Sequence, residues 1–424
     1  MKRLVAIGAL TAAVAGYGGF WDTLNRVQKT VDTVNAVGDA LNMRPANASQ
    51  QAAQPAATAP AATAPAATVG RVQSQAAAVS AAVADPAALA AFAGARTTSA
   101  DTAVPEIKWG NVYVRKPATP EQVLEAKNAY LAEKRNLANA TVRFENVDDA
   151  TVAATLAVFH QASNVDVGKS ALTTLAPFAL LRNVQRLSLN KVDCSDMKPF
   201  AGLSNVKTLS LHYCTIADLA PLAGMRALEQ LDLYGAHVTG SFAPLAACPK
   251  LKKVDFYAVK GPQEVYDSLG ALRQVRDFHG GLTKMTSLKW LSGAVQTESL
   301  QVFAEKIDDF SPVSTLVNLT YFRGWNMDGG SMATALGDLS FLAPCRKLRK
   351  LELPGSAYSN TALIGTFAEL EELDLSNAKQ PVDVSFVKSL PKLKRLSVRG
   401  TEVVNGSAIP ASVKVYSDKK TKGL

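Results

Sequence analysis

One short apolar pattern recurs at nearly constant spacing through the last two-thirds of the chain. The template is L-x-x-L-x-x-L-x-L, and its clearest copies lie at 181–194, 203–216, 225–238, 248–259, 345–353, 367–375 and 390–398. The first apolar residues of the presumed strands are Val142, Val165, Leu187, Leu209, Leu231, Val254, Phe278, Leu300, Phe322, Leu351, Leu373 and Leu396, of which those at 278, 300 and 322 rest mostly on spacing. They follow each other at 22 to 24 residues, except for one interval of 29. Such a period predicts a solenoid, because units this short bury their apolar sides only by stacking.

Side-chain alternation divides each presumed strand into two faces. Leu187 and Leu189 point to one side, as do Leu231 and Leu233, and the residue between each pair points to the other. The leucines are expected to form the core. Twelve strands spaced about 4.8 Å apart would present a shallow exposed surface roughly 50 Å long.

Between the strands the sequence repeats a second element with an aspartate at its start. It reads Asp-Leu-Ala-Pro-Leu-Ala-Gly-Met at 218–225, with variants at 196–203, 309–316 and 383–390. Together with the strand template, this segment resembles the leucine-rich-repeat superfamily, most closely the 22-residue class of bacterial internalins, over roughly 140–415. The resemblance implies an α/β, right-handed solenoid with a curved parallel sheet on its concave side and short helical or irregular returns on its convex side. An open arc lacks the enclosed pocket that catalysis requires, so we expect a non-enzymatic protein-recognition module, with a hydrolase site built across the repeats as a further alternative.

The sequence departs from this family at the third strand position, where many leucine-rich repeats place asparagine. Here the position holds Val192, Cys214, Ala236, Val259, Ser356, Ala378 and Thr401. We expect Cys214, Ser356 and Thr401 to substitute in part as hydrogen-bond donors to the turns. We find no sortase-type anchoring motif near the C-terminus, so wall attachment of the internalin kind is not expected.

The first hundred residues differ in composition from the repeats. Lys2, Arg3 and an apolar run predict a signal peptide over 1–18, with an uncleaved membrane anchor as the alternative. Apolar residues at alternating spacings of three and four then predict an amphipathic helix within 19–45, and its part from 21 to 41 could join several chains. Proline every fifth residue predicts an extended Ala/Pro-rich linker over 46–100. We therefore expect a periplasmic, secreted or cell-surface protein, or one held at a membrane by an uncleaved N-terminal segment.

The remaining boundaries follow from the need to cover the ends of the stack. Thr119, Pro120 and Glu121 form a helix start, so residues 120–136 predict a helix in an N-terminal cap over 101–140. The repeat domain is expected over 141–415, with a last strand near Val413 and Val415. The polar tail 416–424 is expected to fray.

The patterns of most enzymes and metal proteins are not found. The net charge of +9 is spread along the chain without a basic stripe, so no nucleic-acid partner is expected. Gly168-Lys169-Ser170 lacks the further glycine of a phosphate-binding loop, and the four histidines have no ligand spacing, so neither a cofactor nor a metal is expected. The four cysteines, Cys194, Cys214, Cys248 and Cys345, are interpreted as buried thiols.

The exposed face of the presumed sheet is where a partner is expected to bind. Its central column reads Arg143, Asp166, Ser188, Ser210, Asp232, Asp255, His279, Gln301, Arg323, Glu352, Asp374 and Ser397, and the next column gathers several of the scarce aromatic residues. Tyrosine and tryptophan suit binding anchors, although strand propensity alone also favours exposed tyrosines. The candidate binding residues are Tyr213, Tyr234, Tyr257, Trp325, His212, Asp232 and Asp255. The expected partner is a protein, with a glycan or cell wall as the alternative.

Overall fold

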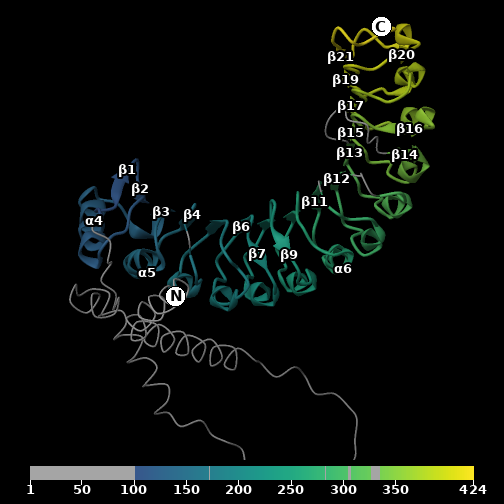
Figure 1. Cartoon of the computed structure of the whole chain (residues 1–424). Helices are drawn as coiled ribbons and strands as arrows, with labels where there is room; N and C mark the ends of the chain where they lie inside the picture. The colour runs from purple at the N-terminus through teal and green to yellow at the C-terminus, as the bar shows by residue number, and fades with distance from the viewer. Residues whose placement is uncertain (1–100, 171, 282, 304–306, 326–334) are drawn as a thin grey trace, which may run out of the picture. The chain divides into compact units, whose positions relative to one another are not determined.

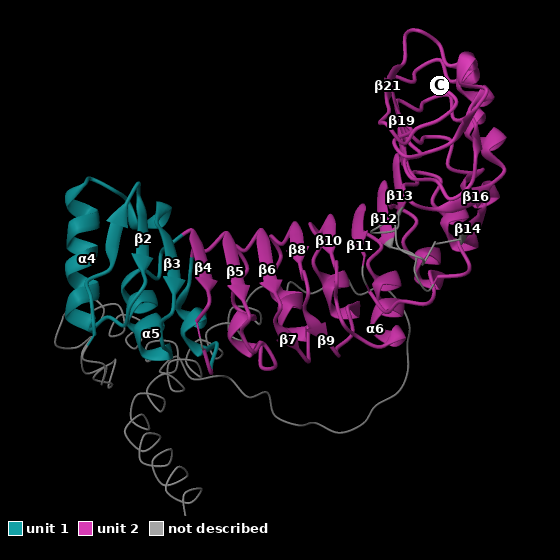
Figure 2. Cartoon of the chain, turned by 45° about the horizontal axis from the view of Figure 1, so that its top comes forward, with its two compact units in different colours: residues 1–162, 174–182 teal, residues 163–173, 183–424 magenta. Residues whose placement is uncertain are grey.

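A computed structural model describes residues 101–424 except 171, 282, 304–306 and 326–334. The predicted signal peptide, amphipathic helix and linker lie outside the described residues. The chain divides into two compact units, whose described parts are 101–162 with 174–182 and 163–173 with 183–424 (Figure 2). The division differs from the expected boundary at 140, because the strand and the helix that follow this boundary belong to the first unit.

The first unit combines a β-hairpin, a third strand and two α-helices. Strands β1 (Glu106–Lys108) and β2 (Asn111–Val114) pair antiparallel, and β2 pairs in parallel with β3 (Thr141–Glu145). The other elements are α4 (Pro120–Ala132), η1 (Leu137–Asn139), α5 (Asp149–Val158) and η2 (Ala176–Leu180). The predicted cap helix is present as α4 but ends four residues early. It starts with a capping box, in which Thr119 and Gln122 each accept a hydrogen bond from the other's backbone N–H.

The second unit is built on one parallel sheet (Figure 1). Its strands are β4 (Asn164–Gly168), β5 (Arg186–Asn190), β6 (Thr208–His212), β8 (Gln230–Asp232), β10 (Lys253–Asp255), β11 (Asp277–Gly280), β12 (Ser299–Phe303), β13 (Tyr321–Trp325), β15 (Lys350–Glu352), β17 (Glu372–Asp374), β19 (Arg395–Ser397) and β21 (Lys414–Tyr416). From Val165 onward, each strand marker pairs with the marker of the next strand, and the last marker, Leu396, pairs with Val415. The predicted strand register is therefore confirmed, including the markers that rested mostly on spacing.

The returns between the strands are short and mostly 3₁₀-helical. They contain α6 (Gln263–Asp267) and the segments η3 (Lys198–Phe200), η4 (Ala220–Gly224), η5 (Ala243–Ala247), η6 (Ser268–Ala271), η7 (Lys289–Ser292), η8 (Ser311–Thr315), η9 (Leu339–Leu342), η10 (Thr361–Thr366), η11 (Ser385–Ser389) and η12 (Gly406–Ala408). Three small parallel pairs lie between them, β7 (Thr215–Ile216) with β9 (His237–Val238), β14 (Ala335–Asp338) with β16 (Ala357–Ser359), and β18 (Val382–Asp383) with β20 (Val403–Val404). The architecture is the predicted α/β one, with a parallel sheet and short helical returns.

The aspartate that starts several of the returns has a local structural role. The Asp218 carboxylate accepts a hydrogen bond from the Ala220 N–H at 2.7 Å, and Asp309 and Asp383 accept in the same way from the second residue after them. This turn orients the chain for the following 3₁₀ segment. The Asp-x-x-Pro element therefore encodes a turn.

The core between sheet and returns contains the inward leucines and all four cysteines. Leu187, Leu209 and Leu231 are fully or almost fully buried, and the four cysteines are buried and unpaired, as predicted. The Cys214 thiol donates to the Leu189 carbonyl at 3.8 Å. The predicted replacement of the asparagine ladder is thus confirmed, since Ser356 likewise donates to Gly324 O and Thr401 to Leu375 O.

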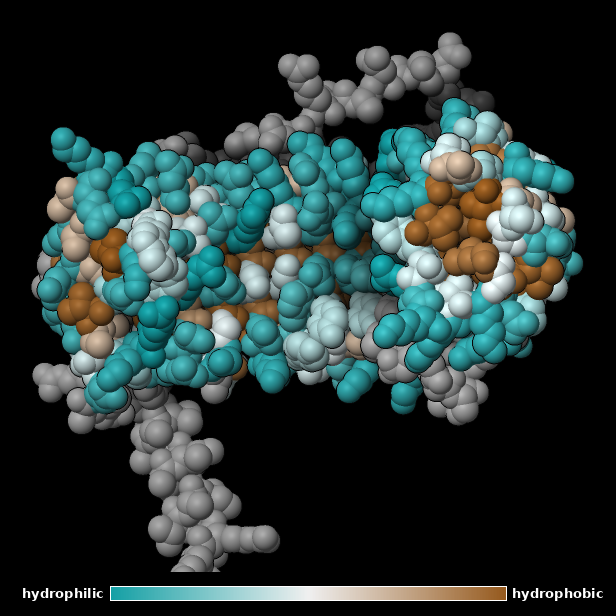
Figure 3. All heavy atoms as spheres, turned by 90° about the horizontal axis from the view of Figure 1, so that it is seen from above, coloured by the Kyte–Doolittle hydropathy of each residue, from teal (hydrophilic) through white to brown (hydrophobic). Residues whose placement is uncertain are grey.

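The C-terminal segment 416–424 differs from the expected frayed tail. Tyr416 belongs to β21, the Asp418 carboxylate accepts from the Gly400 N–H at 3.0 Å, and Thr421 Oγ1 donates to the Val398 carbonyl. These bonds attach the segment to the preceding repeat. Figure 3 shows apolar residues at the end formed by this last repeat, where Val404 and Leu424 are exposed.

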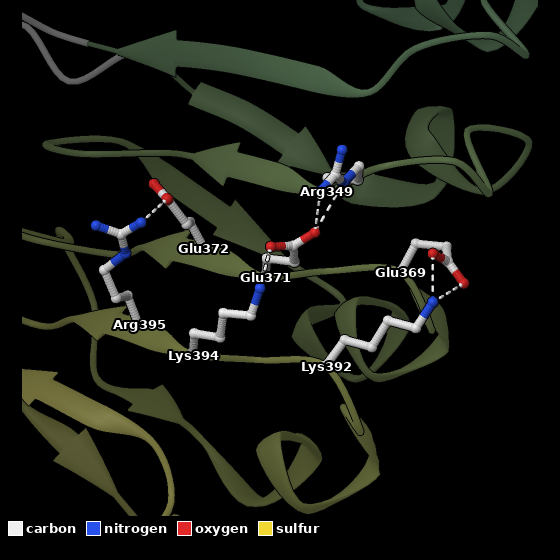
Figure 4. Close-up of polar contacts among 7 residues, drawn as sticks. All are labelled: Arg349, Glu369, Glu371, Glu372, Lys392, Lys394 and Arg395. Carbon is white, nitrogen blue, oxygen red and sulfur yellow. Dashed lines mark hydrogen bonds and ion pairs between the residues drawn. The ribbon is translucent and has the colours of Figure 1, made fainter.

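Charged residues connect three successive repeats near the C-terminus (Figure 4). Glu369, Glu371 and Glu372 lie before and at the start of β17, and the equivalent positions of the two neighbouring repeats hold lysine or arginine. We call this set the charge rows, and its drawn members are Arg349, Glu369, Glu371, Glu372, Lys392, Lys394 and Arg395. Glu371 accepts from Arg349 Nε at 2.8 Å and from Lys394 Nζ at 2.6 Å. These hydrogen bonds, first from Lys394 and then from Arg349, lower the pKa of Glu371 to about 2.

We predict that Glu371 makes part of the stability dependent on pH. Its folded pKa lies below the value of about 4.3 of an unfolded glutamate. The contribution is therefore present above about pH 4.3 and is lost as the pH falls through about 2. Glu371→Gln should lower the thermal midpoint at pH 6 and lose this difference in acid or at high salt. Glu125→Gln, an exposed change on α4, is the control. Equal midpoints for Glu371→Gln and the parent at pH 6 would contradict the prediction.

Candidate functional site

The parallel register brings most of the predicted binding residues onto adjacent strands. His212 ends β6, Asp232 ends β8 and Asp255 ends β10, and Tyr234 and Tyr257 follow two residues after these aspartates. Tyr213 follows His212 directly. Trp325 ends β13, which β11 and β12 separate from β10, so the backbone places this residue outside the cluster.

Four rings on neighbouring strands form a continuous row. His212 lies 5.9 Å from Tyr234 between ring centroids, Tyr234 stacks on Tyr257 at 5.5 Å with an interplanar angle of 3°, and Tyr257 lies 5.4 Å from His279. We call His212, Tyr234, Tyr257 and His279 the ring row. Tyr213 meets the edge of Tyr234 at 5.4 Å and 83°. Because the strands fix their spacing, the rings are held in place before any partner arrives.

Each aspartate of the cluster makes two kinds of hydrogen bond. Asp232 accepts from the Tyr234 N–H through Oδ1 and pairs with His212 Nε2 through Oδ2 at 2.8 Å. Asp255 accepts from the Tyr257 N–H through Oδ1 and pairs with His279 Nδ1 through Oδ2 at 2.7 Å. The carboxylates thus hold both the turns that carry the tyrosines and the imidazoles at the two ends of the ring row.

His279 is the site residue that the sequence prediction missed. It stands in the predicted central column, between Asp255 on one side and Gln301 on the other, but it was not counted as a binding residue. The available signal was its place in that column, one strand from an aspartate. Its imidazole is needed to complete the ring row.

Tyr213 occupies a backbone conformation that is unfavourable for a bulky side chain. Its φ is 55°, and the equivalent turn position holds Gly235, Gly355 or Gly400 in other repeats. The left-handed region costs a non-glycine residue roughly 1–2 kcal/mol. Gly235 has a second role, because a Cβ atom there would lie 2.6 Å from the Tyr213 ring. The Tyr213 ring therefore rests on the glycine of the next repeat, and it remains 49% exposed.

The acid–base state of the site follows from its pairs. The hydrogen bond to Asp232 raises the pKa of His212, and partial burial opposes this rise. Burial also raises the pKa of Asp232, but the hydrogen bonds from His212 and the Tyr234 N–H outweigh it, so the net shift is downward. Burial, followed by the neighbouring Tyr234, raises the pKa of Tyr257.

The imidazoles of the site are paired with carboxylates of the same chain. Each imidazole of the ring row is bonded to a carboxylate, and no hydroxyl or thiol of the described residues hydrogen-bonds either ring. Across 101–424, apart from the residues left undescribed, no group of three or more His, Cys, Asp or Glu side chains could hold a metal ion. The candidate site supplies aromatic edges, three tyrosine hydroxyls and two carboxylates.

We predict that the His212–Asp232 pair makes the stability dependent on pH near neutrality. Because the folded pKa of His212 lies above the unfolded value of about 6.5, the pair contributes fully below that value. This contribution is lost as the pH rises through the folded pKa. His212→Gln should therefore destabilise the protein more at pH 5.5 than at pH 8.5 in urea titrations. The control is His237→Gln, which changes an exposed residue of β9. A loss that is equal at both pH values would refute the linkage.

Comparisons with known proteins give likeness in structure alone. No protein-family profile matches the sequence, and no curated protein sequence matches it. An internalin of Listeria monocytogenes is similar in structure with a TM-score of 0.53 and 20% identity, over 73% of this chain and 86% of the internalin. A leucine-rich-repeat protein of Leptospira interrogans gives a TM-score of 0.54 and 13% identity, over 72% of this chain and 88% of its own.

TLR13 in complex with a single-stranded RNA is also similar, with a TM-score of 0.50 and 15% identity over 73% of this chain and 48% of that one. At these identities the comparisons show the fold, and the predicted leucine-rich-repeat fold is confirmed. None of the helices in the described part of the chain combines the length and apolar character that a bilayer span requires.

Proposed function

We propose that this protein is a non-enzymatic recognition module that binds a partner protein through the exposed face of its parallel sheet. The observation that carries the proposal is the ring row with Tyr213 beside it, a preformed aromatic surface in a protein with few aromatics. Only 7% of the residues are aromatic. This face is the one that the repeat pattern predicts to be concave.

The energetic argument rests on preorganisation. Tyrosine offers a large contact area and loses little rotamer entropy on binding. Stacking of Tyr234 on Tyr257 and the hydrogen bonds of Asp232 and Asp255 have already removed much of the freedom that a partner would otherwise have to restrict. A surface of this kind favours slow dissociation of a matching protein.

Two other partner classes receive less support from the geometry. A glycan is the alternative, since sugars stack on aromatic faces, but Tyr234 and Tyr257 turn faces toward each other and so offer mainly edges and hydroxyls. Nucleic acid would require an excess of cations, whereas the ring row is flanked by Asp232 and Asp255, with Lys191 5.9 Å from the centroid of the Tyr213 ring. TLR13 binds RNA in its complex, but the charge of this site does not favour such a ligand.

Export and self-association remain predictions from residues outside the described part. The pattern of residues 1–18 supports a periplasmic or secreted location, and N-terminal sequencing of the mature protein would test it, since an intact Met1 would exclude cleavage. The helix expected over 21–41 would bring copies together. Sedimentation of the full chain against a variant with polar residues at Val27 and Val31 would test this association.

The central prediction concerns the stacked tyrosines. Tyr234→Ala with Tyr257→Ala should weaken binding by a few kcal/mol in all, because buried tyrosines are typical interface anchors. The immobilised full chain should capture a partner from cell-surface and extracellular proteins, and quantitative mass spectrometry should show its loss with the double variant. A glycan array run in parallel separates the alternative.

Ser188→Ala, on the same face of β5, is the matched control and should leave capture unchanged. If the double variant retains the partner with unaltered affinity, the face around the ring row is not the binding surface.

Tyr213 gives a second prediction, in which stability and binding separate. Tyr213→Gly should release roughly 1–2 kcal/mol of backbone strain and lose about 0.5–1.5 kcal/mol of ring contact with Tyr234. The net change in the free energy of unfolding should thus lie between a loss of about 0.5 and a gain of about 1.5 kcal/mol, while partner affinity falls. Asn377→Gly, at the same turn position in the repeat of β17 and away from the ring row, should change stability alone. A large loss of stability in Tyr213→Gly would show that the ring is structural.

A further inference from the structure

The tip of the β1–β2 hairpin in the first unit has an unusual composition. Lys108 pairs with Asn111, so Trp109 and Gly110 form a two-residue loop. Their φ values are 50° and 79°, the pattern of a type I′ turn. This turn favours asparagine followed by glycine. Gly110 fits its position, whereas tryptophan is a bulky side chain at a position that requires the left-handed conformation.

Burial does not compensate this strain. Trp109 is 81% exposed, while Trp290 in the second unit is 3% exposed. The strained residue therefore contributes neither a favourable turn nor a buried ring within the described part of the chain. Strain that persists without a local structural reason suggests a role in binding.

One cation lies over the exposed indole, and a second lies against the neighbouring glycine. Lys108 Nζ lies 4.7 Å from the centroid of the Trp109 ring. The Arg135 guanidinium lies against Gly110, since a Cβ atom there would be 2.5 Å from its Nη1. Lys134, which precedes Arg135 in the chain, is exposed. The acids are paired, Glu133 with Arg135 at 2.6 Å, and Glu106 with Arg115 at 2.9 Å and Lys108 at 4.0 Å. The tip thus combines one projecting aromatic ring with an excess of positive charge.

We propose that this tip, Trp109 with Lys108, Lys134 and Arg135, docks on an anionic membrane surface. Indole rings concentrate at the level of the lipid headgroups, where one edge is apolar and the other is hydrated. Lysine and arginine side chains next to the ring are attracted by anionic lipids. The charge of the tip is complementary to such a surface.

A protein partner fits the tip less well. Interface anchors lie near the centre of a patch of about 800 Å² per partner, surrounded by contacts that exclude water. A hairpin tip projects one ring and offers little flat surface around it. A bilayer accepts such a ring without a matching pocket. This docking is separate from the partner binding proposed for the second unit.

Flotation of the full chain with vesicles tests the proposal. Vesicles of 70% phosphatidylcholine and 30% phosphatidylserine should bind the parent chain, and pure phosphatidylcholine should bind it more weakly. Trp109→Asn removes the ring and supplies the residue that the turn favours, so the thermal midpoint should be unchanged or higher. Its partition to the anionic vesicles should fall about tenfold or more. Lys108→Glu should also reduce it.

The difference between the parent chain and Trp109→Asn isolates the tip from any contribution of residues 1–100. Vesicles containing brominated lipid should quench part of the tryptophan emission of the parent chain and less of the variant's. Equal flotation of the two proteins, or no flotation of the parent with anionic vesicles, would overturn the proposal. Loss of protein capture by Trp109→Asn with unchanged flotation would also overturn it, in favour of a protein partner.

Discussion

The structure of the second unit depends on the in-phase burial of inward side chains between successive parallel strands. Val165, Leu187 and Leu209 each pair with the equivalent residue of the next repeat, and this alignment continues to Val415. Because side chains alternate along a strand, a shift of one residue would turn every leucine outward. The hydrophobic effect therefore selects a single register.

The same register determines what lies on the opposite face. Residues 20 to 25 positions apart in the chain become neighbours, so Asp232 meets His212, and Asp255 meets His279. The core does not require these polar pairs, yet it brings their strands together. Asp232 and Asp255 each connect the fold with the exposed face, because each carboxylate forms the turn after its strand and also orients an imidazole. A binding surface can thus change its side chains while the core remains unchanged.

The sequence predicted what depends on periodicity and missed what depends on local contacts. Strand register, exposed columns and buried cysteines follow from spacing. Helix α5 was not predicted, because every residue from Thr151 to Val158 is buried and the helix has no amphipathic pattern. The ordered segment after Tyr416 depends on Asp418 contacts between turns. Spacing also grouped Trp325 with the tyrosines, although the strand order separates them. The ring row itself depends on rotamers that neighbouring strands impose.

Tyr213 and Trp109 combine backbone strain with an exposed aromatic ring. Both have positive φ at turn positions where glycine or asparagine would be more favourable, and both expose much of the ring. Lys191 and Ala258 have the same conformation, so strain alone does not identify a site. A positive φ together with an exposed aromatic ring is informative, because such a ring is stabilised little by the core and makes the turn less favourable. At Tyr213 the ring extends an aromatic row, and at Trp109 a lysine lies over the ring. In each case the neighbouring side chains indicate the chemistry of the partner that would compensate the strain.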